Sequence, residues 1–295
     1  MNERTRGLAL ALGAYGIWGL LPLYFVPLRA VGAIEVVAHR ICWSLLLLGA
    51  IVLFSGRWPK LRAALTSPAT LGRLTASALL IAVNWLVYIW SVETRHVVEA
   101  SLGYFLNPLV NVLLGVALLG ERLGRAQMLA VALATIGVAV LGMASGVGQG
   151  LWVSLTLAIS FGLYGLVRKV TPVEALEGLL VETLVLVPVA AGYLAWHGAP
   201  GLAQGGVVPV LLLASGAATA APLLMFAGAA RRLPLSVLGL VQYLAPSLQF
   251  LIAVALLGER LTIAHVACFA LIWTGLAVVA LDSLRAVRRR AGQAT

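Results

Sequence analysis

Ten long apolar segments, joined by short connections, restrict what this sequence can fold into. Each is long enough to cross the hydrocarbon core of a bilayer, which takes about 20 residues at a rise of about 1.5 Å per residue. The composition agrees, since 62% of the residues are hydrophobic and 10% are charged, against about a quarter charged in soluble domains. The sequence therefore predicts an all-α integral membrane protein with ten transmembrane helices, over roughly residues 8–28, 34–54, 73–92, 97–119, 126–144, 150–167, 177–196, 208–228, 235–257 and 262–281.

One stretch of the chain occurs twice, 138 residues apart. Residues 102–123 and 240–261 share 12 of 22 positions, including the unbroken block VALLGERL. Five predicted segments separate the copies, and an odd number reverses the direction in which the second copy crosses the membrane. The pattern predicts two inverted five-helix repeats (5+5), covering residues 1–145 and 146–295, with the boundary near the SGVGQG turn. Inverted repeats of this kind are typical of secondary transporters that open alternately to either side.

The basic residues are distributed unevenly between the two predicted sides. With the N-terminus in the cytoplasm, 16 Lys and Arg residues fall on the inner side and three, Arg29, Arg95 and Arg260, on the outer side. This asymmetry follows the positive-inside rule and predicts both termini inside, with a basic cytoplasmic tail. The net charge of +10 is thus explained by orientation and by attraction to anionic lipid, and we expect no nucleic-acid partner.

Several functional classes lack their usual signatures here. No GxxxxGK[ST] motif occurs, so an ATP-driven pump is not expected, and the GxGxG pattern in the predicted connection at 145–150 follows no strand. No paired acids or metal-ligand set fall at one depth, so we expect no enzyme, no cofactor and no bound metal. The basic start followed by an apolar run resembles a signal peptide, but its length and missing cleavage site favour an uncleaved first helix.

Charged residues within the apolar segments are the first candidates for function. A charge at the bilayer centre costs about 2.5–3.5 kcal/mol, so such side chains normally face protein or a cavity. Arg40 lies about two turns inside its segment, and Glu99 is at similar depth. The two residues either form a structural ion pair or contribute to substrate binding. His39 and Glu182 are candidates for proton coupling, although a lone histidine is more often a packing residue.

Aromatic and amide side chains form a second group. Tyr104, Asn107 and Asn111 share one helix face, which either lines a cavity or makes hydrogen bonds between helices. Pro108 and its repeat equivalent Pro246 remove a backbone hydrogen bond within their helices and predict kinks that could act in gating. The complete set of cavity candidates is Trp18, Arg40, Tyr88, Glu99, Tyr104, Asn107, Asn111, Tyr164 and Gln242.

The two GERL tetrads have a structural interpretation. Gly120 and Gly258 are expected to end their helices, as glycine commonly does. The following Glu and Arg are then expected at the water boundary.

Three motifs resemble a known family. The AYGIWGLLPLY start, the HRICWS segment and the EASLGYFLNPLVNVLLG–GERL stretch are similar to the RarD, or chloramphenicol-sensitive-protein, group of the EamA-type drug/metabolite transporter superfamily. The resemblance covers about residues 7–282. It implies a 5+5 inverted-repeat fold with a central cavity, and a multi-pass permease of the bacterial inner membrane.

These observations together predict a secondary active transporter that moves a small amphiphilic drug or metabolite by alternating access, with export favoured. An importer or exchanger of amino acids or metabolites with the same fold, and a channel, are the alternatives. The expected partners are a small-molecule substrate and the lipid bilayer, and the sequence is compatible with both a monomer and a homodimer.

Overall fold

The computed structural model describes residues 2–93, 97–144, 151–255 and 262–292. The predicted boundary between the halves, at 145–150, and most of the second VALLGERL copy lie outside these residues. The described helices are α1 (Glu3–Phe25), η1 (Val26–Leu28), α2 (Ala33–Phe54), α3 (Trp58–Thr66), α4 (Pro68–Glu93), α5 (Val97–Leu119), α6 (Arg125–Ala144), α7 (Leu151–Val170), α8 (Ala175–His197), η2 (Pro200–Ala203), α9 (Val208–Ala230), α10 (Leu235–Gln242), α11 (Leu244–Ala255) and α12 (Ile263–Gly292).

The described part of the chain is entirely helical, and nine of its helical segments are long and apolar enough to cross a membrane. The segment predicted at 235–257 differs, because it forms two shorter helices, α10 and α11, that meet at Tyr243. Pro246 lies in the first turn of α11, where amide hydrogens have no partner within the helix and a proline is tolerated. The structure also contains the short helix α3, which the sequence analysis did not predict.

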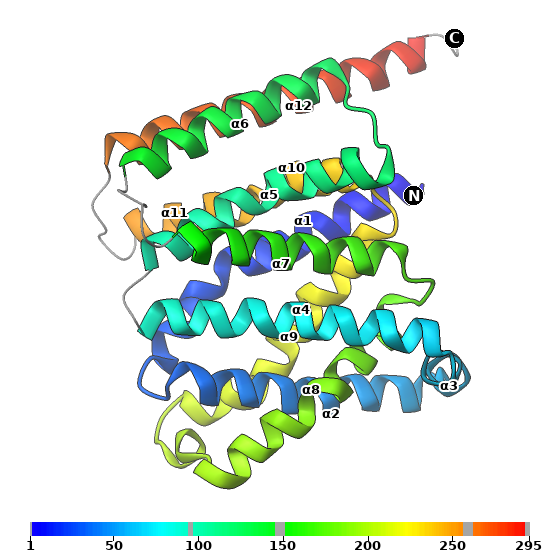
Figure 1. Ribbon diagram of the computed structural model, residues 1–295, viewed down its shortest axis with the longest axis vertical. Coiled ribbons are helices and arrows are strands. Elements are labelled where there is room, and N and C mark those ends of the chain that lie inside the picture. Colours follow the sequence, from blue (N-terminus) through cyan, green and yellow to red (C-terminus); the bar gives the residue numbers. More distant parts are fainter. Residues whose placement is uncertain (1, 94–96, 145–150, 256–261, 293–295) are drawn as a thin grey trace.

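The long helices lie in a stack, and the chain runs back and forth between its two ends (Figure 1). The N-terminus of α1, the C-terminal part of α12 and α3 lie at one end, which we call the termini end. The connections that carry η1 and η2 lie at the opposite end, which we call the far end. Helices α6 and α12 pack along each other at one edge of the stack. The central helices α1, α2, α4, α5, α7, α8 and α9 make the other large interfaces.

Helix α12 joins this edge to the rest of the bundle through aromatic side chains. The rings of Phe105 and Phe269 lie 5.4 Å apart in an edge-to-face arrangement. The Trp273 indole N–H donates a hydrogen bond of 2.8 Å to the Ser247 hydroxyl. A polar group that faces lipid would have no water to bind, so this bond satisfies the indole within the protein.

The first GERL tetrad links two distant parts of the chain. Gly120 ends α5 with a positive φ of 64°, as expected of a C-terminal glycine. Glu121 does more than meet water, because its carboxylate accepts hydrogen bonds from the Leu235 and Ser236 amides, at 2.6 and 2.9 Å, and from the Ser236 hydroxyl at 2.7 Å. These amides open α10, where a carboxylate satisfies unpaired donors and the helix dipole. The expectation of a solvated Glu121 is thus replaced by a helix cap.

Helices α2 and α9 approach each other unusually closely. A Cβ atom added to Gly216 would lie 2.4 Å from the Trp43 carbonyl carbon and 2.7 Å from the Ser44 amide nitrogen. The Ser44 hydroxyl donates a hydrogen bond of 3.1 Å to the Gly216 carbonyl across the same contact. Since the neighbours are backbone atoms, no side-chain rotation can relieve the overlap that a larger residue would create.

Replacing Gly216 with alanine should therefore separate α2 from α9. We expect Gly216→Ala to lower the stability by about 1–3 kcal/mol, the usual cost of overpacking a filled interior. Thermal denaturation of the purified protein in detergent measures this loss. Gly192→Ala is the matched control, because Gly192 is an exposed helical glycine with open space around it. Equal melting temperatures for the two variants would contradict the close α2–α9 contact.

Candidate functional site

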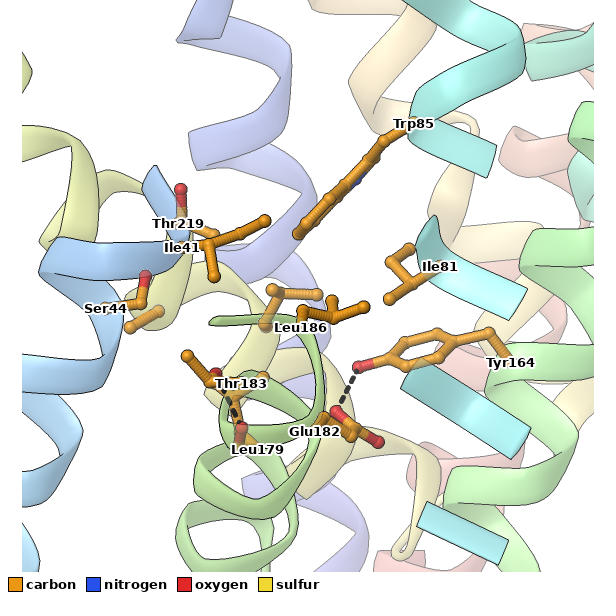
Figure 2. Close-up of a pocket in the computed structure, with 12 residues that line it drawn as sticks. Ile41, Ser44, Ile81, Trp85, Tyr164, Leu179, Glu182, Thr183, Leu186 and Thr219 are labelled. Atoms are coloured by element: carbon orange, nitrogen blue, oxygen red, sulfur yellow. Dashed lines mark hydrogen bonds between the residues drawn. The ribbon is translucent and has the colours of Figure 1, made fainter. Parts of the chain in front are cut away.

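Five helices enclose a pocket in the middle of the bundle (Figure 2). It contains about 360 Å³ of space between atoms, within the usual range for small-molecule sites. Its walls are mostly apolar, with a few hydroxyl groups and one carboxylate. The lining residues are Ile41, Ser44, Ile81, Trp85, Tyr164, Leu179, Glu182, Thr183, Leu186, Thr219, Ala220 and Leu223.

Glu182 marks one side of the pocket and is held by three side chains. Its carboxylate lies 3.4 Å from the Arg168 Nη1, accepts a hydrogen bond from Ser77, and accepts another of 3.4 Å from the Tyr164 hydroxyl. Figure 2 shows the Tyr164 hydroxyl directed at this carboxylate. Both Arg168 and Glu182 are almost completely buried. Burial without a partner would be costly for either charge, so the ion pair makes a carboxylate at this depth possible.

Arg168 reaches this position because α8 has a glycine opposite it. A Cβ atom at Gly178 would lie 2.0 Å from the Arg168 Nη1, so the guanidinium occupies the place of a missing side chain. The sequence analysis counted Arg168 among the inner-side charges that set the orientation. The structure instead buries it as the partner of Glu182.

Arg40 lies at the other side of the pocket, toward the far end. Its Nε donates a hydrogen bond of 2.8 Å to the Thr219 hydroxyl. The guanidinium carbon lies 5.2 Å from the Trp85 ring centroid and 5.5 Å from that of Phe25, within the range of a cation–π interaction. Thr219 and Trp85 both line the pocket, so Arg40 stands at its edge.

Tyrosines extend this polar region toward the far end of the bundle. Tyr24, Tyr88 and Tyr104 are electrostatic neighbours of Arg40, and the rings of Tyr88 and Tyr104 meet edge to face at 5.8 Å. Tyr88 is 40% exposed, so this group opens to the surroundings. We call Tyr24, Phe25, Trp85, Tyr88 and Tyr104 the aromatic vestibule. The Glu99 side chain lies outside the described part of the structure, so the predicted pair between Arg40 and Glu99 stays a prediction.

The two polar anchors of the pocket have a common spacing in the sequence. Arg40 and Glu182 are 142 residues apart, and so are their hydrogen-bonding partners Thr219 and Ser77. Each anchor is therefore bonded to a hydroxyl residue that comes from the other half of the chain. Glu35 and Glu177, one near the start of α2 and one near the start of α8, repeat the same spacing.

Trp18 belongs to an aromatic cluster behind the pocket wall. Its ring contacts Tyr15, Phe161 and Phe226 at centroid distances of 5.6–5.8 Å. Phe226 in turn stacks on Tyr164 at 5.8 Å, which lines the pocket. Trp18 thus supports the position of Tyr164 and does not itself line the pocket described here.

The predicted amide stripe faces a helix and does not line this pocket. The Asn111 Nδ2 donates a hydrogen bond of 2.6 Å to the Gln242 Oε1 where α5 crosses α10. Asn107 is buried, and its Oδ1 has no hydrogen-bond partner among the described protein atoms. The helices approach closely here, since a Cβ at Gly239 would lie 2.6 Å from the Pro108 carbonyl oxygen. Helix α5 continues through Pro108 without interruption.

His39 lies on a different face of α2 from the pocket. Its Nε2 lies 3.6 Å from the Glu35 carboxylate, and both side chains are buried. Glu35 also accepts a hydrogen bond of 2.8 Å from the Gly201 amide in η2. These contacts tie the start of α2 to the connection between α8 and α9.

Of the predicted residues, the structure thus places Tyr164 and Glu182 on the pocket wall and Arg40, Tyr88 and Tyr104 at its edge. Sequence reasoning missed Ser44, Ser77, Arg168 and Thr219. The spacing of 142 residues, applied to Arg40 and Glu182, could have identified Ser77 and Thr219 as a pair.

Comparisons with known proteins agree with this architecture. The model of the EamA-like transporter family matches residues 5–143. Protein RarD of Streptomyces exfoliatus is 48% identical over 98% of this chain and 92% of its own length. Protein RarD of Escherichia coli K12 is 44% identical, with 98% of each chain covered. An uncharacterized transporter of Vibrio cholerae is also 44% identical, over 97% of this chain and 95% of the relative.

A solved crystal structure shares the fold. It superposes with a TM-score of 0.75 at 21% sequence identity and covers 94% of this chain and 98% of its own. At this identity the likeness concerns the fold alone, and the full-length relatives carry the assignment. By these relatives this multi-pass membrane protein belongs to the RarD group of the EamA-like transporter family.

Proposed function

We propose that this protein is a secondary active transporter that carries a small amphiphilic molecule by alternating access. It consists of two inverted five-helix halves, residues 1–145 and 146–295, with both termini in the cytoplasm of a bacterial cell. The substrate binds in the pocket between Arg40 and Glu182. The observation that carries the proposal is the pair of equivalent polar anchors, one from each half, on the two sides of one central pocket.

The packing of the helices supports the inverted repeat. Helix α1 packs on α9 as α7 packs on α4, and α2 packs on α9 as α8 packs on α4. Helix α1 packs on α10 and α11, as α7 packs on α5. Each interface between the halves therefore has a counterpart when the halves are exchanged. Arg40 lies seven residues after the start of α2 and Glu182 seven after the start of α8, and these helices start from opposite ends.

The termini end is held closed by ionic contacts between the halves. The Arg57 Nη1 lies 2.9 Å from the Glu177 carboxylate, the Arg57 Nη2 lies 2.8 Å from that of Glu174, and Lys60 also binds Glu174. The hydrogen bonds from Lys60 and Arg57 lower the pKa of Glu174. This carboxylate is thus charged above its lowered pKa, and the contact is lost only as the pH falls through that value. Glu3 pairs with Arg232 at 2.9 Å nearby.

The far end is more open, since the aromatic vestibule leads from the surface to Arg40 and the pocket. A site open at one end and latched at the other suits a transporter that exposes its substrate to one side at a time. With the basic termini end in the cytoplasm, as the positive-inside rule favours, the vestibule faces outward. We propose the bacterial inner membrane as the location and export as the direction.

A counterflow assay separates this proposal from a channel. Proteoliposomes loaded with an excess of an unlabelled substrate should transiently accumulate the labelled form against its gradient, because a carrier exchanges one molecule for another. A metabolite and drug library screened in this way identifies the substrate, and opposite pH gradients establish the direction. Flux that grows linearly with concentration and shows no counterflow would indicate a channel.

Glu182 is the proposed site of proton coupling, since its carboxylate borders the pocket and is bonded to two hydroxyl groups. Glu182→Gln keeps the shape but cannot titrate, so we expect proton-gradient-driven transport to fall at least tenfold while counterflow persists. Because this change alone leaves Arg168 buried without a partner, at a cost of about 3–5 kcal/mol, the double variant Arg168→Met/Glu182→Gln is measured beside it. Glu3→Gln is the exposed control. Unchanged gradient-driven transport in the double variant would exclude Glu182 as the coupling residue.

Weakening the contacts at the termini end should expose the pocket from that side. Arg57→Ala removes two charge-assisted hydrogen bonds, each worth about 1.5–3 kcal/mol, and should raise the population of the state open at the termini end about tenfold or more. A Thr183→Cys reporter, in a Cys42→Ala/Cys268→Ala background, measures this by thiol labelling in inside-out vesicles. Arg62→Ala, an exposed change on the same helix as Lys60, is the control. Equal labelling rates in Arg57→Ala and Arg62→Ala would argue against a latch.

A further inference from the structure

Arg40 has an incomplete set of partners in the described part of the chain. Its Nε is bonded to Thr219, but no described carboxylate lies within ion-pairing distance of the guanidinium, and no described residue accepts a hydrogen bond from Nη1 or Nη2. A guanidinium presents these donors in a planar fork that fits a carboxylate with two parallel bonds. The hydrogen bond to Thr219 fixes the orientation of the fork and leaves its outer edge available.

The other anchor of the pocket is already neutralised. Glu182 forms an ion pair with Arg168, and both residues are buried. Among the described side chains, the pocket and its edge therefore carry one positive charge that the protein does not balance. A cation within a membrane protein is costly unless it is paired, so an anionic ligand would relieve the cost that Arg40 creates.

The surroundings of Arg40 define what such an anion must carry beside its charge. Trp85 stacks near the guanidinium and also forms part of the pocket wall. Beyond it the wall is apolar, through Ile41, Ile81, Leu186 and Leu223. An aromatic or aliphatic body held against this wall would leave its charged group beside Arg40.

We propose that Arg40 binds the carboxylate of the substrate, and that the transported compounds are organic monoanions with an aromatic or aliphatic body. This inference rests on the proposed transport function and names the substrate class for the same pocket. Arg40 contributes two hydrogen bonds and the compensating charge, Thr219 holds its side chain in place, and Trp85 contacts the body of the ligand.

Binding to the purified full-length protein tests the charge requirement directly. N-benzoylglycine supplies an aromatic ring and a carboxylate without an ammonium group, and its primary amide is the neutral match. Isothermal titration calorimetry should show that the parent binds the acid at least tenfold more tightly than the amide. In Arg40→Gln the affinity for the acid should fall by roughly tenfold to one hundredfold, as expected for lost charge-assisted bonds, while the affinity for the amide stays the same.

Two further variants sharpen this result. Arg40→Lys retains the charge but not the fork, so its loss should be intermediate. Arg29→Gln removes an exposed arginine near the far end and should bind both compounds as the parent does. Retained amide binding shows that Arg40→Gln is folded. Equal affinity of the parent for acid and amide, or equal acid binding by the parent and Arg40→Gln, would overturn the proposal.

A structural pair between Arg40 and Glu99 is tested by removing both charges. If Arg40 serves only to balance Glu99, the double variant Arg40→Gln/Glu99→Gln should regain parental acid binding, and that result also overturns the proposal. If Arg40 binds the ligand, the double variant stays as weak as Arg40→Gln.

Flux measurements distinguish this inference from the proposed function. Acid binding that depends on Arg40, with no counterflow of any compound in proteoliposomes, would sustain the anion site and overturn the transport function. Counterflow of neutral or cationic compounds only, unaffected by Arg40→Gln, would sustain transport and overturn the anion site.

Discussion

The need to pair every buried polar group governs this structure. A bilayer interior supplies no water to solvate a charge or a free backbone group, so the two charged anchors of the pocket exist only with partners. Glu182 obtains Arg168, Ser77 and Tyr164, and Arg40 obtains Thr219 and two aromatic faces. These partners come from several helices, so the arrangement of the bundle and the chemistry of the pocket depend on the same contacts. Helix packing without side-chain overlap, as between Gly216 and Trp43, brings the partners into reach.

The pocket combines specificity with a largely apolar surface. Most of its wall is aliphatic or aromatic, and the few polar groups lie at opposite sides. Such a site holds a ligand by shape and dispersion while one or two polar contacts set its orientation. The tight ionic cluster at the termini end and the half-exposed tyrosines at the far end give the two entrances different character. One entrance depends on charge and the other on aromatic packing.

The sequence predicted the helical membrane architecture because long apolar segments have few other possible structures. It also selected Arg40, Tyr164 and Glu182, since polar side chains in such segments need protein around them. It could not show which neighbour covers a given helix face, and so the stripe of Asn107 and Asn111, proposed for a cavity, packs where α5 crosses α10. Ser77 and Thr219 escaped notice because hydroxyl residues in a helix can bond to their own backbone. Arg168 escaped because it stands two residues from the end of α7, where a charge is normally solvated.

Helix α5 is continuous through Pro108, whereas its counterpart is divided into α10 and α11 at Tyr243. Two halves that differ in this way have unequal stiffness, because a divided helix bends at its junction with less resistance than an unbroken one. Conformations related by exchanging the halves then differ in free energy, and an empty molecule will rest predominantly in one of them. The imperfection of the repeat thus supplies a built-in preference for one resting orientation before any solute or gradient acts on the protein.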